Sequence, residues 1–320
     1  MELFNPNSRI NVMGWRHLNM ALSVILAIVC YLSWVERGDA KFGVDFRGGV
    51  EIAIKTPQDP GIDVVRKAVS AAGVSDAVVQ AFEDNRGEYS IRMGSGDDKS
   101  HIQAVRDELL KLPQVEVLKE DIVGPAIGEE VRRSGLIAFL IALACIFVYV
   151  MIRFEWTFGL GAVVATLHDA LLTTGIIVMV GKEINGAVLA ALLTIVGYSV
   201  NDTIVVYDRI RENLFKPVKG AKESLIELFN RSINETFSRT ILTSTTTLFV
   251  CACFYLLGSG PLIDLGFTLA VGIILGTYSS IFIASPIVLL LQKERPNAAA
   301  KTGKDAVSKG DYKPNKAQAA

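Results

Sequence analysis

Hydrophobic residues along this chain gather into six runs, and each run is long enough to cross a bilayer as a helix, which takes about 20 mostly apolar residues. The runs cover residues 18–35, 135–152, 157–180, 184–206, 240–257 and 262–291. Polar residues gather between the first two runs and after the last one. The pattern predicts a polytopic α-helical membrane protein with six transmembrane helices and one sizeable domain outside the membrane.

The polar block between the first two runs has the patterns of a small α+β domain. Residues 50–54 alternate as a strand does, and residues 62–72 and 100–112 have a helical period. Short strands are expected at 77–82, 89–93 and 115–118, with a hairpin turn at 85–87. This βαββαβ order predicts a ferredoxin-like sheet. The block has no recognisable nucleophile–base pair or phosphate loop, so we expect a binding or mechanical domain.

The positions of Lys and Arg predict the orientation, because short cytoplasmic loops are enriched in both. The loop at Arg153 and the segment 209–239 are basic, whereas the opposing short loops carry only Lys182. Both termini are therefore expected in the cytoplasm. The expected divisions are a cytoplasmic N-terminus at 1–17, the first span at 18–35, an extracytoplasmic (periplasmic) domain at 36–134, spans two to six at 135–291 with a cytoplasmic loop at 207–239, and a basic, disordered cytoplasmic tail at 292–320.

Two segments near the membrane need separate interpretation. The first run resembles a signal peptide, but Trp34 and Val35 stand where small residues should mark a cleavage site, so we expect it to remain as a span. Residues 223–237 have the pattern of an amphipathic helix and are expected to lie on the cytoplasmic face.

Composition narrows the class of protein further. Hydrophobic residues make up 51% of the 320 residues and charged residues 20%, with a mean hydropathy of +0.39, which excludes a purely soluble enzyme, a disordered chain and a disulfide scaffold. The net charge of −1 gives no basic field that would attract nucleic acid. All four cysteines lie in apolar runs, so we expect no disulfide framework, no metal site and no cofactor.

Charged residues inside the spans are the strongest candidates for function, because burying them in a membrane costs several kcal/mol. Asp202 lies late in the fourth run and Arg239 opens the fifth. The two helices run in opposite directions, so both residues lie near the cytoplasmic edge and can form an ion pair. Protonation of Asp202 would break that pair and leave Arg239 uncompensated. We expect this pair to couple a proton to movement; a static structural bridge is the alternative.

Further polar residues in the spans are candidate auxiliary groups. His168 and Asp169 lie near the middle of the third span, where His168 is either a proton carrier or part of an interhelical hydrogen bond. Successive helix residues point about 100° apart, so the two are not expected to face one partner. The Ser and Thr residues of the fifth run either join the site or bond to their own helix backbone. The remaining auxiliary candidates are Asn201, Tyr198 and Thr243.

Several motifs resemble the SecD/SecF family of bacterial protein-export membrane proteins, in its shorter SecF form. Residues 196–203 read Val-Gly-Tyr-Ser-Val-Asn-Asp-Thr, and residues 208–213 read Asp-Arg-Ile-Arg-Glu-Asn. Matching segments also occur at 123–128 and 239–244. At the start of the external domain, a family motif supplies Asp45, Arg47, Gly48 and Gly49. The short external block suits SecF better than the larger SecD.

The resemblance implies a resistance-nodulation-division type membrane fold and a non-enzymatic accessory subunit of the Sec translocase. It implies use of the proton-motive force in late stages of preprotein export across the bacterial inner membrane. The implied partners are SecD in a heteromeric complex, the SecYEG channel, the SecA motor, YajC and YidC, the translocating preprotein and the lipid bilayer. Asp202 and Arg239 match family positions associated with proton conduction.

Two functions of other classes are alternatives. One is a half-size subunit of a proton-driven small-molecule or lipid exporter of the same superfamily, whose members usually carry both halves in one chain. The other is an intramembrane hydrolase, which needs a nucleophile beside a base. His168 has no evident serine partner at a matching depth, so the sequence gives the hydrolase little support.

Overall fold

The computed structural model describes residues 10–74, 77–81, 87–94, 99–215, 223–258 and 260–292. Six helical segments in this part of the chain are long and apolar enough to cross a membrane, which confirms the expected architecture. The helices are α1 (Arg16–Glu36), α5 (Pro125–Arg153), α6 (Trp156–Met179), α7 (Gly186–Phe215), α8 (Leu225–Leu257), and α9 (Pro261–Ser279), which continues through the π-helical turn η3 (Ser280–Ala284) into α10 (Ser285–Leu291).

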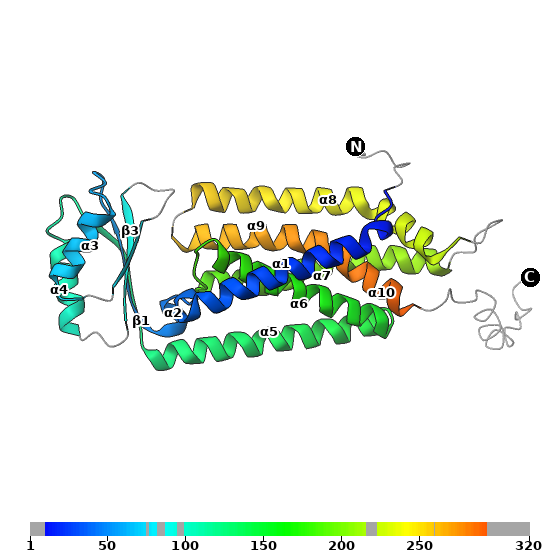
Figure 1. Ribbon diagram of the computed structural model, residues 1–320, viewed down its shortest axis with the longest axis horizontal. Helices are drawn as coiled ribbons and strands as arrows, with labels where there is room; N and C mark the ends of the chain where they lie inside the picture. Colours follow the sequence, from blue (N-terminus) through cyan, green and yellow to red (C-terminus); the bar gives the residue numbers. More distant parts are fainter. Residues whose placement is uncertain are drawn as a thin grey trace, which may run out of the picture.

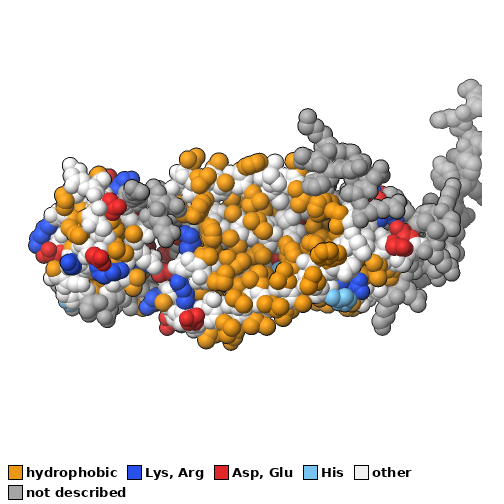
Figure 2. All heavy atoms as spheres, turned by 45° about the horizontal axis from the view of Figure 1, so that its top comes forward, with side chains coloured by type: hydrophobic (Ala, Val, Ile, Leu, Met, Phe, Trp, Pro, Cys, Tyr) orange, Lys and Arg blue, Asp and Glu red, His pale blue; other side chains and the backbone are white. Residues whose placement is uncertain are grey.

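The bundle is layered, with α6, α7 and α9 inside and α1, α5 and α8 outside. The outer three bury a much smaller share of their apolar residues than α6, α7 and the span formed by α9 and α10. Hydrophobic side chains cover the flank of the bundle, and charged side chains gather toward its two ends (Figure 2). This distribution fits a bundle that lies across a membrane with its apolar band in the hydrocarbon.

A small antiparallel sheet lies at one end of the bundle, and the start of α1 and the end of α10 lie at the opposite end (Figure 1). The strand order is β2-β3-β1-β4, and all neighbours are antiparallel, as expected for the ferredoxin-like arrangement. The expected hairpin turn falls on residues 85–87, of which only Gly87 is described. The elements are β1 (Gly49–Lys55), α3 (Ile62–Ala71), β2 (Val78–Ala81), β3 (Glu88–Met93), α4 (Lys99–Leu109) and β4 (Glu116–Val123).

The core of this domain lies on one face of the sheet only. Because side chains alternate along a strand, Ile52 and Ile54 point to the face that α3 and α4 cover, on the side away from the bundle (Figure 1). They pack with Val65 of α3 and Val105 of α4 in a cluster separate from those of the bundle. The domain therefore folds around its own core and presents its second, polar face to the bundle.

The sheet is joined to the bundle by two adjacent connections, which we call the neck (residues 42–49 and 123–128). It includes the short helix α2 (Val44–Arg47) before β1, and the start of α5 after β4. Gly48 and Gly49 have φ values of +74° and +135°, a conformation that L side chains rarely adopt. Gly128 of α5 packs directly on the backbone of Gly48. Glycines are needed here because two backbones meet without room for side chains.

The α7 and α8 helices are longer than their apolar runs. The segment 207–239, expected as a cytoplasmic loop, is helical to Phe215 and again from Leu225. The amphipathic helix expected at 223–237 is the first part of α8, which begins with a capping box formed by Ser224 and Glu227. Its residues Leu228, Phe229 and Ile233 are buried in the bundle core instead of lying at a membrane surface. Residues 216–222 and the basic tail from residue 293 lie outside the described residues.

A strap of residues 10–13 precedes α1 and is held against the first half of α8. The backbone amide of Ile10 donates to Asn234 at 3.1 Å, and the Asn234 side chain donates back to the Ile10 carbonyl at 2.9 Å. One turn earlier on α8, Asn230 accepts from the Met13 amide at 2.8 Å, and Met13 is fully buried. Two asparagine side chains thus fix the entry of the chain into its first span.

Replacing Gly128 with Ala is expected to lower the free energy of unfolding by about 1–3 kcal/mol, because the neck has no space for a methyl group. A Cβ at Gly128 would lie 2.8 Å from the amide nitrogen of Gly48. The midpoint of thermal unfolding of the purified protein measures the loss. Gly197→Ala is the matched control, since nothing lies within 4 Å of a Cβ at that helical glycine. Equal midpoints for the two variants would contradict tight packing in the neck.

Candidate functional site

Asp202 lies inside the bundle and meets a serine of the neighbouring helix. It occupies the inner face of α7, and the residue is only 2% exposed. Its Oδ2 accepts a hydrogen bond from Ser244 Oγ of α8 at 3.4 Å. Ser244 also contacts Thr277 Oγ1 of α9 at 2.6 Å and accepts from the Tyr198 hydroxyl at 3.4 Å. Ser244 is therefore the point where polar groups of α7, α8 and α9 meet.

A second carboxyl, that of Asp169 in α6, lies in the same layer of the bundle. It is completely buried, and its Oδ2 accepts hydrogen bonds from Ser199 at 2.5 Å and Ser279 at 2.7 Å. Its Oδ1 lies 3.0 Å from Nδ1 of His168. Ser199 and Asp202 are three residues apart on α7 and so share a face of that helix. The two carboxyl groups are linked through α7 on one side and through α9 on the other.

Small residues bring the central helices close enough for this layer to form. Gly276 of α9 faces Ser199 of α7, where a Cβ would lie 3.1 Å from the Ser199 Cβ. Gly272, one turn earlier, packs on Ile195 in the same way. Glycines four residues apart allow membrane helices to approach closely. In this bundle they join α9 to α7 and place the hydroxyls of α9 beside both carboxyl groups.

Arg239 does not reach Asp202 in this conformation. Arg239 is exposed on α8, and the described residues include no ion pair within 4.0 Å between it and Asp202. It lies five residues before Ser244, or about 7.5 Å along the helix axis and well round from the Ser244 face. Thr240 and Ser244 occupy the buried face instead. The expected ion pair is therefore not formed in this conformation, although Arg239 still interacts electrostatically with the Asp202 carboxyl.

The auxiliary candidates divide into two groups. Tyr198 joins the layer through Ser244, whereas Asn201 is exposed. Thr243 donates to the carbonyls of Arg239 and Thr240 at 3.1 and 3.0 Å in its own helix, and its hydroxyl also interacts with the Asp202 carboxyl. His168 and Asp169 contact each other. The expectation from the sequence concerned a common third partner only and did not address a contact between the two.

Ser199, Thr277 and Ser279 are members of the layer that sequence reasoning did not select. Each hydroxyl alone is an ordinary component of a membrane helix. Their spacing in the sequence could have identified them. Ser199 precedes Asp202 by three residues, and Thr277 and Ser279 lie one and three residues after Gly276 of α9. Helical spacing from a buried carboxyl would have identified the first of them.

The geometry disfavours a hydrolase, although Ser, His and Asp side chains lie together. In a catalytic triad the imidazole stands between the hydroxyl and the carboxylate and takes the proton of the hydroxyl. Here the Asp169 carboxyl stands between, because both Ser199 and His168 contact it. Nε2 of His168 is buried and has no hydrogen-bond partner among the described residues. The arrangement can hold and pass a proton but does not activate a nucleophile.

The motif at the neck has a structural role at the far end of α7. Asp45 Oδ2 accepts a hydrogen bond from the amide of Gly186, the first residue of α7, at 2.7 Å. Asn185 Oδ1 accepts from the amide of Val188 at 3.0 Å and so caps the same helix. Arg47 is exposed at the end of α2. Asp45 thus ties the entry of the sheet domain to the helix that carries Asp202.

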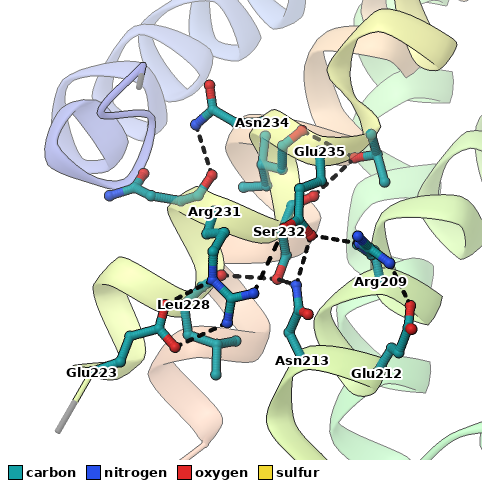
Figure 3. A network of polar contacts seen from close by, with 12 residues as sticks. Arg209, Glu212, Asn213, Glu223, Leu228, Arg231, Ser232, Asn234 and Glu235 are labelled. Atoms are coloured by element: carbon teal, nitrogen blue, oxygen red, sulfur yellow. Dashed lines mark hydrogen bonds and ion pairs between the residues drawn. The ribbon is translucent and has the colours of Figure 1, made fainter. Parts of the chain in front are cut away.

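At the opposite end of the bundle, a charged network joins α7 to the first half of α8 (Figure 3). Arg209 pairs with Glu235 at 2.5 Å, and Arg231 forms two hydrogen bonds with Glu223 at 2.8 and 2.9 Å. Asn213 also donates to Glu235 at 2.9 Å. The contacts of Arg209 and Asn213 with Glu235 hold the two helices together, whereas the Arg231–Glu223 pair lies at the start of α8. Within the described residues, no group of three His, Cys, Asp or Glu side chains is placed to hold a metal ion.

Comparisons with known proteins match the chain to one family. The model of the family "Protein export membrane protein SecD/SecF, C-terminal" matches residues 104–294. The Protein translocase subunit SecF of Desulfurispirillum indicum is 44% identical over 89% of this chain and 91% of its own. That of Rickettsia bellii is 37% identical over 88% of this chain and 93% of its own.

Solved structures are similar over nearly the whole chain. The crystal structure of SecDF, a translocon-associated membrane protein from Thermus thermophilus, matches with a TM-score of 0.82 and 34% identity over 91% of this chain. A SecDF structure in a super-membrane-facing form matches with a TM-score of 0.65 and 33% identity over 96% of this chain. This chain spans only 40% and 41% of those two solved chains.

Removing one hydroxyl from the Asp169 site should destabilise the bundle. Ser279→Ala is expected to cost about 1–3 kcal/mol, because the buried Asp169 carboxyl loses one of its two serine donors. Thermal unfolding in detergent measures the change. Thr194→Ala is the control, since Thr194 is exposed and bonds only the Ala190 carbonyl of its own helix at 2.8 Å. A loss no larger than that of the control would mean that the hydrogen bond to Asp169 contributes little.

Proposed function

This chain belongs to the SecD/SecF family of protein-export membrane proteins, and from that premise we propose that it uses the proton-motive force to promote late stages of preprotein export. It is a multi-pass membrane protein and an accessory subunit of the Sec protein translocase, not an enzyme. The exporter alternative has no support of comparable extent, because the curated relatives that match nearly the full chain are translocase subunits.

The subunit works in a translocase complex that contains SecD. We infer that a separate SecD chain supplies the part of SecDF that this chain does not cover. SecYEG, SecA, YajC and YidC are the further partners that we propose, and the moving preprotein would be met by the sheet domain. The site of action is proposed to be the bacterial inner membrane.

The proposed orientation places both termini in the cytoplasm and the domain of residues 36–134 in the periplasm. Two features support it. The start of α1 and the end of α10 lie at the bundle end away from the sheet (Figure 1). That same end carries Arg153, Arg209 and Arg231, as the enrichment of basic residues on the cytoplasmic side requires.

The observation that carries the proton-coupled function is the burial of the Asp202 carboxyl with no cation paired to it within 4.0 Å among the described residues. The hydroxyls of Ser244, at 3.4 Å, and of Thr243 offset only part of the cost of burying a carboxylate at this depth, so the conformation described suits the protonated acid. Loss of the proton would leave a buried negative charge, and Arg239 lies on the adjacent helix within one to two turns. We propose that Arg239 approaches the ionised Asp202 and leaves again on protonation.

His168 and Asp169 are proposed as an auxiliary proton-holding pair. A proton that passes between Nδ1 and Oδ1, which lie 3.0 Å apart, leaves the total charge of the pair unchanged. Ser199 contacts Asp169 and shares a face of α7 with Asp202. A change in protonation at either carboxyl therefore acts on α7. Thr243 is proposed to hydrogen-bond the Asp202 carboxyl, and Tyr198 and Asn201 are proposed to act through the shape and polarity of the approach to it.

Asp202→Asn is the direct test. The amide keeps the shape of the side chain but cannot lose a proton, so the part of export that depends on the proton gradient should fall about tenfold or more, a change of about 1.4 kcal/mol or more in effective barrier. Export is measured in vesicles containing the complete translocase, with and without a gradient. Asp208→Asn is the control, because that carboxyl lies on the same helix but is exposed. Full gradient-dependent export by the Asp202 variant, in a correctly assembled complex, would overturn the proposal.

A further inference from the structure

The sheet domain and the helix bundle meet without a shared apolar core. The apolar side of the sheet packs against α3 and α4 in its own cluster. Its open face, formed by Glu51, Ala53, Ser90, Arg92 and Lys119, borders a cavity of about 740 Å³ above the bundle. Charged side chains gather at this junction (Figure 2). Beyond the neck, polar contacts must therefore set how the sheet sits over the helices.

One ion pair crosses this junction from the middle of the open face. Arg92 of β3 contacts Glu183, and their side chains are only 12% and 17% exposed. Burial lowers the pKa of the Arg92 guanidinium, and the nearby carboxylates of Glu51 and Asp264 oppose that effect, while Arg47 adds to it. Arg92 stays charged in this setting and is the cation that the sheet offers to the bundle at this point.

Glu183 belongs to the turn between α6 and α7 (residues 180–185), which is fixed to the bundle on several sides. Lys182 pairs with Asp264 in the first turn of α9 at 3.0 Å. Asn185 donates to the other oxygen of Asp264 at 2.7 Å. The Ile184 carbonyl accepts from the Gly43 amide of the neck at 2.9 Å, and the Ile184 amide donates to the carbonyl of Lys41, just before the neck, at 2.8 Å. A displacement of the turn would therefore also displace the start of α9 and the backbone around Gly43.

This turn leads directly into α7, the helix that carries both Ser199 and Asp202. Gly186, its first residue, is held by Asp45 of the neck. From Gly186 to Asp202 is one uninterrupted helix, about 24 Å long at 1.5 Å per residue. A helix of this length, packed on both α8 and α9, transmits a displacement along its axis. The turn therefore lies at the sheet end of α7, and the buried Asp202 carboxyl lies farther along the same helix.

We propose that the Arg92–Glu183 ion pair is the strut through which a displacement of α7 reaches the sheet domain. Arg92 and Glu183 are positioning residues that act through α7 and do not themselves carry protons. The inference rests on the proposed proton-driven function and names the contact by which that function is passed outward. Because the cavity leaves the open face unsupported nearby, losing the strut should uncouple the sheet without unfolding either part.

The test replaces the ion pair by a chemical link that can be made and broken. Arg92 and Glu183 are both changed to Cys in a chain whose native cysteines have been replaced and which still exports. A short bis-methanethiosulfonate reagent then bridges the two thiols in place of the two side chains, and dithiothreitol cleaves the bridge. The assembled complex is studied in vesicles, with export measured with and without a proton gradient at each stage.

The unlinked double variant is expected to lose several-fold of its gradient-stimulated export and to keep its gradient-independent export. Linking should restore the stimulation, and reduction should remove it again. The control is Arg106→Cys with Glu120→Cys, a pair 3.4 Å apart that lies wholly within the sheet domain and should respond to neither reagent. Glu183→Gln, which removes one charge with little change in shape, should reproduce the unlinked loss and guards against failure of the double variant to assemble.

Two results would overturn the strut. One is full gradient stimulation in both Glu183→Gln and the unlinked double variant. The other is a linked form that is as inactive as the unlinked one, because a contact that must open cannot be a strut. Both results leave the proposed function standing if Asp202→Asn still abolishes stimulation. An active Asp202→Asn variant, in contrast, removes the proton-driven function itself.

Discussion

The cost of burying a carboxyl group among membrane helices is the constraint on which the rest of this structure depends. Asp169 and Asp202 lie in the centre of the bundle, where neither water nor lipid can solvate a charge. The two carboxyl groups differ in their hydrogen-bond partners. Asp169 receives two serine donors and contacts a histidine, whereas Asp202 has a serine contact at 3.4 Å and further interactions with Thr243 and Arg239 of α8. The Asp169 carboxyl is therefore held by shorter hydrogen bonds than the Asp202 carboxyl.

That difference depends on how closely the inner helices pack. The glycines of α9 bring its backbone against α7, and this contact places Thr277 and Ser279 beside the two carboxyl groups. Glycine residues do the same at the neck, where the sheet domain joins α5. The two tight regions lie at different levels of the molecule and share α7, whose first residue is capped from the neck and whose middle carries Asp202. A single helix thus runs from the neck of the sheet domain to the buried Asp202 carboxyl.

Much of the fold could be anticipated from periodicity alone. Apolar runs of bilayer length identified all six spans, and alternation with helical period identified the βαββαβ domain, because both patterns are consequences of burial. The site was predicted less completely. Asp202 stood out as a charge in a span, but its partner Ser244 depends on the rotation of α8 about its axis, which depth does not determine. Ser199 and Ser279 carry no charge to mark them. The extension of α7 to Phe215 was missed, and the helix expected at 223–237 was not recognised as continuous with the fifth span, because polar residues there pair with each other instead of facing solvent.

The strap before α1 has a consequence for how the protein is made. Its partners Asn230 and Asn234 are more than two hundred residues away in sequence, with |i−j| of 217 and 224. A ribosome therefore completes the first span, the external domain and three further spans before either asparagine exists. Contacts between such distant parts of a chain form late in folding. The first helix is therefore made with its entry segment unsecured, and the strap can bind its partners only after the first half of α8 has been made.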